Sequence, residues 1–228
     1  DLQERNNFAL VNEDFKKIFK RKKYLSKLVS IKFRDYKKIK SKIKNDYLKS
    51  NTNDENMNFV YALSKLLKIT KSSFIKSMSS FLGLPHRYEI FFKKKGITFI
   101  NDSKATSLEA TKYALASSKN VYWILGGLPK NKDKIDLRFI KNNIIKSYII
   151  GKNINFFKKQ LRNKIKFSVT KNLKKSISSA LKDIKSLKRV SNTILLSPGA
   201  ASFDQFKNFE SRGNEFKKLS KLYAKKYI

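Results

Sequence analysis

Apolar positions follow one pattern before about residue 82 and another after it. The first part opens with a predicted strand at Phe8–Asn12 and continues with apolar pairs in lysine-rich stretches, which fit either a strand or a helix. Two helices follow, the first capped by Asp54 and the second by Thr70. Each helix has an apolar face that we expect to be buried: Phe59, Val60, Leu63, Leu66 and Leu67 in the first, and Phe74, Ile75, Met78 and Phe81 in the second.

From residue 88 onward, short apolar runs alternate with stretches of helical periodicity. Residues 88–92 and 97–100 flank the turn Lys93-Lys94-Lys95-Gly96, which predicts a hairpin. Further strands are predicted at the apolar runs 121–125, 148–150, 167–169 and 193–196. Helices are predicted at 107–118, 135–145, 153–162, 172–187 and 206–227. This alternation indicates an α/β fold, with a mostly parallel sheet and helices on both of its faces.

The 228 residues are enough for one or two domains with cores of their own. Gly83 and Pro85 end the second helix of the first part. We therefore predict two domains, residues 1–84 and residues 85–228.

Three polar loops each follow one of the predicted strands. They are Asn101–Thr106, Gly126–Lys130 and Ser197–Ser202. Because the carboxyl ends of parallel strands meet at one edge of a sheet, we expect these loops to lie together where ligands bind. Their small residues, hydroxyl groups and lysines suit an anion or a carboxylate. A plainer interpretation of the first loop is a turn in which Asp102 or Ser103 caps the following helix.

The chain carries 53 Lys and Arg against 17 Asp and Glu, a formal net charge of +36. Such a charge attracts phosphate backbones, so a basic nucleic-acid-binding module is an alternative function. We favour a lysine-rich solvated surface, because the basic residues are spread along the chain and no nucleic-acid recognition motif accompanies them. Nucleic acid is therefore not an expected partner.

Composition excludes several kinds of site. With no cysteine and with His86 as the one histidine, the sequence has no disulfide, no thiolate nucleophile and no zinc site built from Cys or several His. It has no membrane-spanning apolar run, no signal peptide, no P-loop motif and no G-x-G-x-x-G motif. Because the chain begins with Asp1 rather than Met, we expect a fragment.

Four motifs follow one another along the chain: GLPHR at 83–87, NDSKAT at 101–106, Gly126-Gly127 with Lys130, and LLSPGAASFDQF at 195–206. In this order they resemble the motifs of the Mur ligases, and among these the D-glutamate-adding ligases. NFE at 208–210 and RGNEF at 212–216 extend the match, and Asn53 and Asn56 fit before it. Three positions depart from the family: Gly199-Ala200 replaces the usual Ala-Cys, Thr52 stands where histidine is frequent, and Ser107 where asparagine is frequent.

The resemblance implies an ATP-dependent amide ligase of peptidoglycan synthesis, cytoplasmic and monomeric. Such an enzyme uses ATP and Mg²⁺ to phosphorylate the carboxylate of UDP-N-acetylmuramoyl-L-alanine, and the amine of D-glutamate attacks the acyl phosphate. Residues 1–84 would be the tail of a P-loop-type α/β central ATPase domain, and residues 85–228 a Rossmann-like C-terminal domain. The uridine-nucleotide domain, the P-loop and the magnesium ligands would precede residue 1, so we expect the chain alone to be inactive. Another Mur-type ligase, or a folylpolyglutamate synthase, is the alternative that keeps the reaction and changes the amino acid.

The resemblance also implies roles for individual residues. The adenosine site would be lined by Asn56, Arg87 and Asp102, with Asp102 accepting from ribose hydroxyls. Lys104 would be catalytic, near the nucleotide or the acyl phosphate. D-Glutamate would be held by Thr106, Lys130, Ser202, Phe203 and Phe209, since a dicarboxylate needs a cation and neutral donors. No metal ligand is expected within the chain, and His86 is interpreted as structural.

Overall fold

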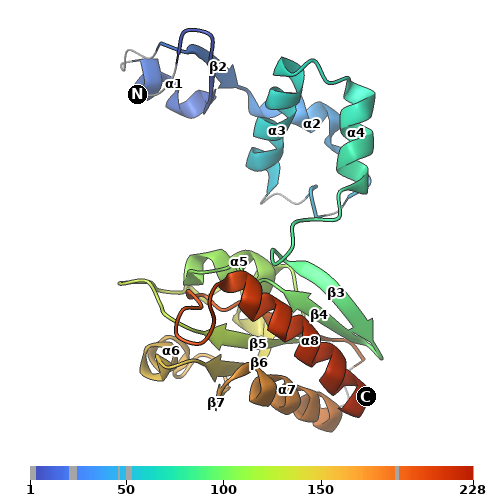
Figure 1. The fold of residues 1–228 in the computed structure, drawn as a ribbon, viewed down its shortest axis with the longest axis vertical. Helices are drawn as coiled ribbons and strands as arrows, with labels where there is room; N and C mark the ends of the chain where they lie inside the picture. Colours follow the sequence, from blue (N-terminus) through green and yellow to red (C-terminus); the bar gives the residue numbers. More distant parts are fainter. Residues whose placement is uncertain (1–3, 21–24, 46, 50–52, 188–189, 228) are drawn as a thin grey trace. The chain divides into compact units, whose positions relative to one another are not determined.

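The computed structural model describes residues 4–20, 25–45, 47–49, 53–187 and 190–227 (Figure 1). Asp1 and Thr52, which the sequence analysis singled out, lie outside these residues. The chain divides into two compact units, Asp1–Leu82 and Gly83–Ile228. This division falls close to the boundary predicted between residues 84 and 85.

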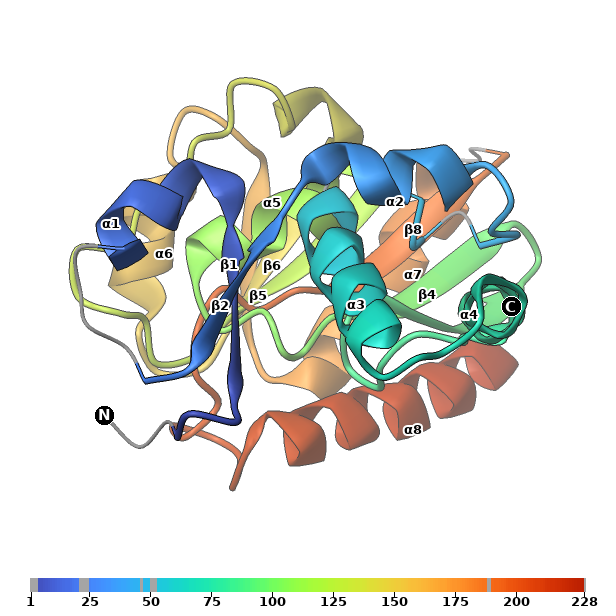
Figure 2. The ribbon, with the colours of Figure 1, turned by 90° about the horizontal axis from the view of Figure 1, so that it is seen from above.

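The first unit combines a small parallel sheet with short helices. Its strands β1 (Phe8–Asn12) and β2 (Lys27–Ile31) pair in parallel, as Figure 2 shows. Between them lie the 3-10 turn η1 (Glu13–Phe15) and α1 (Lys16–Lys20). Three longer helices follow, namely α2 (Phe33–Lys40), α3 (Asp54–Leu66) and α4 (Lys71–Ser80).

The helix caps of this unit agree only in part with those predicted from the sequence. Thr70 caps α4 as predicted, by accepting a hydrogen bond from the backbone N–H of Ser73. The cap predicted at Asp54 is wrong, because Asp54 is the first residue of α3 and its carboxylate pairs with Lys40. The N-cap position of α3 is held by Asn53, whose side chain makes no capping hydrogen bond.

The apolar face predicted for the first helix is also wrong. Val60, Leu63 and Leu67 are 41%, 46% and 63% exposed. The buried residues of α3 are instead Met57, Asn58 and Ser64, which lie on the other side of the helix. Spacings of three and four residues place Met57, Tyr61 and Ser64 on one face. The side of α3 that carries these residues is therefore the buried one, and the predicted apolar side is not. On α4, Phe74 is buried and the other residues of the predicted face are half-buried.

The second unit is built on a six-stranded sheet with the order β3-β4-β8-β5-β6-β7. β3 (Glu89–Lys94) and β4 (Ile97–Asn101) form the predicted hairpin. Its two-residue turn has positive φ at both Lys95 and Gly96, as a tight hairpin requires. The other strands run parallel to β4: β5 (Val121–Gly126), β6 (Ile144–Ile150), β7 (Phe167–Lys171) and β8 (Asn192–Leu196).

Helices cover both faces of this sheet (Figure 1). α5 (Leu108–Ala116) and α6 (Ile154–Leu161) pack on the face that carries Trp123 and Leu125. α7 (Leu173–Leu187) and α8 (Phe209–Tyr227) pack on the opposite face, against Tyr122 and Ile124. Because successive residues of a strand point to opposite faces, one apolar run serves two cores. The predicted α/β fold is confirmed. None of the described helices is both long and apolar enough to cross a membrane.

One predicted element of this unit is wrong, the helix at 135–145. Residues 135–140 form no helix, and a short 3-10 turn, η3 (Lys141–Asn143), leads directly into β6. Ile135, Leu137 and Ile140 are nevertheless buried in the core beneath α5 and α6. The Asp136 side chain accepts from both the backbone and the guanidinium of Arg138, a local pattern that competes with helical hydrogen bonds.

Candidate functional site

The three polar loops meet at the carboxyl edge of the second unit's sheet. β8 lies between β4 and β5 and is parallel to both, so the loops leave neighbouring strands in the same direction. Backbone hydrogen bonds join them, from Gly126 to the carbonyl of Pro198 (2.9 Å) and from Gly199 to the carbonyl of Ala105 (2.9 Å). The predicted convergence of the loops is confirmed.

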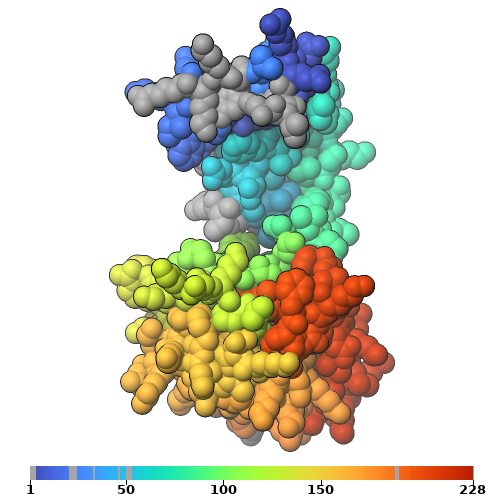
Figure 3. Space-filling model, turned by 60° about the vertical axis from the view of Figure 1, so that its left-hand side comes forward, coloured from blue at the N-terminus to red at the C-terminus, as the bar shows by residue number. Residues whose placement is uncertain are grey.

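The loops after β5 and β8 are also paired beyond the ends of their strands. Leu128 and Ala201 exchange two backbone hydrogen bonds, of 2.8 and 2.9 Å. Figure 3 shows the two segments side by side at the surface of this unit. A Cβ atom at Gly127 would lie 2.3 Å from the Ala201 carbonyl oxygen, and the φ of Gly127 is 133°. This approach therefore requires glycine.

Asp102 anchors the start of the first loop. Its Oδ2 accepts a 2.6 Å hydrogen bond from Ser197 Oγ, and its Oδ1 accepts from the backbone N–H of Tyr88 at 3.1 Å. Burial raises the pKa of Asp102 to about 6, although these hydrogen bonds and the positive charge of Arg87 oppose the shift. The carboxylate thus holds together the loops at 83–88, 102–107 and 197–202.

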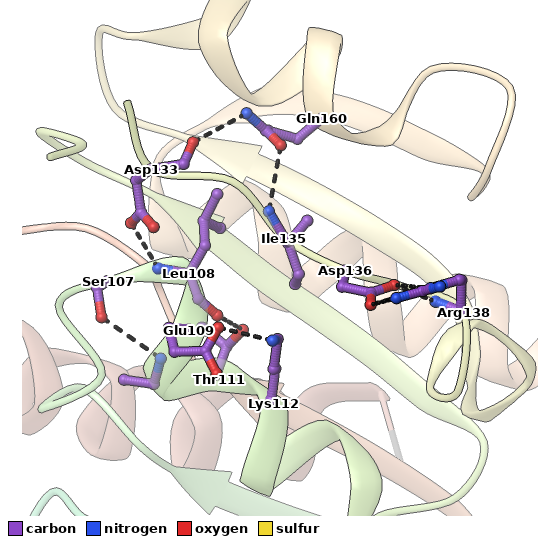
Figure 4. A network of polar contacts seen from close by, with 11 residues as sticks. Ser107, Leu108, Glu109, Thr111, Lys112, Asp133, Ile135, Asp136, Arg138 and Gln160 are labelled. Carbon is purple, nitrogen blue, oxygen red and sulfur yellow. Dashed lines mark hydrogen bonds and ion pairs between the residues drawn. The ribbon is translucent and has the colours of Figure 1, made fainter. Parts of the chain in front are cut away.

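Neither Asp102 nor Ser103 caps α5, so that interpretation of the loop is wrong. Ser107 is the N-cap residue, and its Oγ accepts from the backbone N–H of Ala110. Asp133, in the loop after β5, accepts a 2.7 Å hydrogen bond from the backbone N–H of Leu108 (Figure 4). Gln160 of α6 bonds to the backbone of Asp133 and of Ile135 in the same network. The loop that carries Lys130 is therefore attached to both α5 and α6.

His86 belongs to a buried polar cluster behind the loops. The Nδ2 of Asn101 lies 2.9 Å from His86 Nδ1 and 2.9 Å from Glu89 Oε2. Because Asn101 Oδ1 accepts from the backbone N–H of Ser103, its amide nitrogen faces the histidine, and His86 Nδ1 accepts. Burial, and then the charge of Lys217, lower the pKa of His86, which favours this neutral acceptor form. The arrangement fits a structural histidine.

The sequence analysis did not single out Arg212, although it lies at the centre of the site. Its guanidinium, on the first turns of α8, is 1% exposed. Nε donates to Ser103 Oγ at 3.0 Å, and Nη2 donates to the carbonyls of Ser103 and Ala200 at 2.9 and 3.0 Å. A usable signal was present: Phe209, Arg212 and Phe216 share helical spacing, so an arginine stands on the apolar face of the last helix.

The residues assigned by resemblance lie in different surroundings. Around the loops of the second unit, Lys104 is exposed with its Nζ 3.9 Å from the centroid of the Phe209 ring, and Thr106 is half-buried. Lys130 and Arg87 are exposed, Ser202 is buried, and Phe203 is 70% exposed. Asn56 belongs to the first unit, where it is exposed on α3.

The described part of the chain offers no cluster of carboxylates for a magnesium ion. Among the described residues, no group of three or more His, Asp and Glu side chains could hold a metal ion. The sequence also has no P-loop to cradle phosphates. The loops instead provide cations, hydroxyls and backbone N–H groups, which suit carboxylates and other anions.

Comparison with known proteins gives a consistent result. No family model matches the chain. It is 35% identical over 180 residues to the UDP-N-acetylmuramoylalanine–D-glutamate ligase of Rickettsia felis, covering 79% of this chain and 40% of that protein. It is 41% identical over 166 residues to the ligase of the same name from a Wolbachia of Brugia malayi, covering 72% of this chain and 33% of that protein.

A solved structure supports the fold. The structure of MurF from Acinetobacter baumannii matches 91% of this chain and 52% of that one, with a TM-score of 0.56 and 12% identity. The chain spans 33–40% of the length of the two curated relatives described above. Together, the four motifs, the α/β fold and these relatives show that about three quarters of this chain is similar to UDP-N-acetylmuramoylalanine–D-glutamate ligases, and that its fold is similar to that of a Mur ligase.

Proposed function

We propose that this chain carries the amino-acid-binding part of an ATP-dependent ligase that joins D-glutamate to UDP-N-acetylmuramoyl-L-alanine in peptidoglycan synthesis. The relatives that bear this name share 35% and 41% of the aligned residues. As part of the proposal, residues 1–84 belong to a central ATPase domain and 85–228 form the C-terminal domain of a monomeric, cytoplasmic enzyme.

The observation that carries the proposal is the meeting of three polar loops on the neighbouring strands β4, β8 and β5. A dicarboxylate amino acid needs a cation and several neutral donors that converge on two carboxylates. Each loop contributes one such group: Thr106 follows β4, Lys130 follows β5 and Ser202 follows β8. Phe203 and Phe209 would complete this site from the chain that follows β8.

Arg87 and Asp102 of the second unit would face the nucleoside, and Asn56 is proposed separately as a nucleotide-binding residue of the first unit. Both oxygens of Asp102 already accept hydrogen bonds, but a carboxylate has about four acceptor positions, so a ribose hydroxyl can still be accommodated. The exposed guanidinium of Arg87 lies close enough to lower the pKa of Asp102 against the effect of burial. Arg87 therefore favours the ionised form of Asp102, which is the acceptor form.

Lys104 would be the catalytic cation of this chain. Its ammonium group lies over the face of Phe209, at 3.9 Å from the ring centroid, which restricts its direction while leaving the residue exposed. A cation fixed in this way can stabilise negative charge on a transferred phosphoryl group or an acyl phosphate. ATP, when bound with Mg²⁺, would supply the phosphoryl group that activates the substrate carboxylate.

The test is phosphate release by the full-length gene product with ATP, Mg²⁺ and UDP-N-acetylmuramoyl-L-alanine. We expect release that depends on D-glutamate and does not occur with L-glutamate or L-lysine. Release with another amino acid would identify a different Mur-type ligase. A folded full-length protein that releases no phosphate with any amino acid would contradict the proposal, and salt-dependent nucleic-acid binding would then be measured.

A further inference from the structure

Arg212 carries a buried positive charge for which the described part of the chain offers no ion pair. Its side chain is 1% exposed, and its hydrogen bonds go to one hydroxyl and two carbonyl oxygens. Its Nη1 is buried and finds no hydrogen-bond partner among the described residues. Burial lowers the pKa of Arg212 to about 10 although the negative charge of Asp204 opposes the shift, so the guanidinium is still charged at neutral pH. A buried charge that is neither ion-paired nor fully hydrogen-bonded costs free energy, so its presence here indicates a role other than stability.

The contacts of Arg212 connect two of the loops directly. Ser103 begins the segment that leads to Thr106, and Ala200 lies two residues before Ser202. Ser103 Oγ also donates a 2.8 Å hydrogen bond to the carbonyl of Phe209, at the start of α8. One planar side chain therefore fixes the loop after β4, the loop after β8 and the first turn of the last helix.

The unpartnered Nη1 lies beside the third loop. A Cβ atom built on Gly127 would be 3.2 Å from it, so Nη1 lies next to the backbone at the end of β5. The same loop continues through Leu128, which pairs with Ala201, to Lys130. Asp102 is held separately, by Ser197 and Tyr88, so the contacts of Arg212 do not include the proposed nucleoside residues.

From this geometry we propose that Arg212 is a positioning residue for the amino-acid substrate. It holds the loops that carry Thr106, Lys130 and Ser202 at the spacing that the two carboxylates of the substrate need. The proposal rests on the proposed function for the identity of that substrate. The fixed charge of Arg212 also attracts a dicarboxylate, although the guanidinium does not contact the substrate. A planar guanidinium that reaches three acceptors at fixed angles cannot be replaced by an ammonium group.

The test is Arg212→Lys in the full-length gene product, which keeps the charge and removes the fork. We expect the KM for D-glutamate to rise by about 10-fold or more, because small misplacements of binding groups are costly, while the KM for ATP changes by less than about twofold. The matched control is Arg138→Lys, since Arg138 makes a similar forked contact with Asp136 in an exposed position. That control should leave both constants unchanged.

A second measurement does not depend on activity. Hydrogen exchange of Arg212→Lys should be accelerated at residues 103–106 and 199–203, while the strands of the sheet keep wild-type rates. If Arg212→Lys does not fold, Ser103→Ala is measured instead, because it removes one acceptor and should produce a smaller change of the same kind.

The two proposals fail in different ways. If the wild type releases no phosphate, the proposed function fails, and local exchange in the loops still decides whether Arg212 holds them. If the wild type is active and Arg212→Lys matches it in the KM for D-glutamate and in exchange, the positioning role is overturned. Faster exchange throughout the second unit would likewise overturn it, since Arg212 would then be a general packing residue.

Discussion

Ser197 Oγ and Asp102 Oδ2 form a 2.6 Å hydrogen bond between residues that are 95 positions apart in the chain. The bond joins the loop after β8 to the loop after β4, and both groups are buried. Because the carboxylate is held away from water, burial raises its pKa to about 6. The proposed nucleoside site therefore contains a group that titrates just below neutral pH.

The stability of the second unit should depend on the protonation of Asp102. The folded pKa of about 6 lies above 3.8, the ordinary value for an aspartate, so the folded state binds the proton more tightly. The stabilisation is fully present below about pH 3.8 and is lost as pH rises through about 6. Relative to Asp102→Asn, the wild type should be more stable at pH 5 than at pH 8 by roughly 1–2 kcal/mol.

Urea unfolding followed by tryptophan fluorescence measures this difference. Trp123 is the only tryptophan in the sequence and is fully buried in β5, so its signal reports on the second unit. Other titrating groups affect both proteins equally and cancel in the comparison. A difference between wild type and Asp102→Asn that stays constant from pH 5 to pH 8 would show that the pKa of Asp102 is not raised.

Gly213→Ala should destabilise the second unit although alanine favours helices. Gly213 lies inside α8, and a Cβ atom there would be 2.2 Å from His86 Nδ1 and 3.0 Å from Asn101 Nδ2. We expect the free energy of unfolding to fall by about 1–3 kcal/mol, because overpacking a rigid polar cluster outweighs helix propensity. The control is Asn214→Ala, at the next, exposed position of α8, which should be neutral or slightly stabilising. Equal effects of the two substitutions would show that the helix and His86 are not in close contact.

The central strands β5 and β8 could be predicted because they are buried along their whole length, on both faces of the sheet. A run such as Val121–Leu125 has no polar position that could face water, which leaves a central strand as the simplest structure. The meeting of the loops followed from the parallel direction of these strands. That β8 inserts between β4 and β5 could not be predicted, since strand order depends on contacts between distant segments.

The errors have local physical causes. Residues 135–140 have helical spacing of apolar residues, but the contact of Asp136 with Arg138 forms a turn instead. Arg212 was missed because charged residues are expected on the solvated face of a helix, and only its three acceptors make burial possible.

Arg87→Ala should weaken nucleotide use and leave the amino acid unaffected. Arg87 is exposed next to Asp102, on the loop that also supplies the backbone N–H of Tyr88. In the full-length gene product we expect the KM for ATP to rise by about 10-fold, as for loss of a charged contact, with the KM for D-glutamate within about twofold. Arg138→Ala, which removes an exposed arginine elsewhere in the unit, should change neither constant. An unchanged dependence on ATP would remove Arg87 from the nucleotide site.

Lys130→Ala should raise the KM for D-glutamate by about 10- to 100-fold, because a carboxylate loses its cationic partner. Lys130 is exposed in the loop after β5, and this loop is anchored to α5 by Asp133. With a net charge of +36, any lysine adds to the general attraction for anions, so the variant needs a control that removes the same charge nearby. Lys132→Ala provides it, since Lys132 is exposed in the same loop. If both variants raise the KM for D-glutamate equally, and the effect disappears at high salt, Lys130 contributes only to the general electrostatic attraction for anions. If Lys130→Ala alone acts and the effect persists in salt, the ammonium group contacts the substrate.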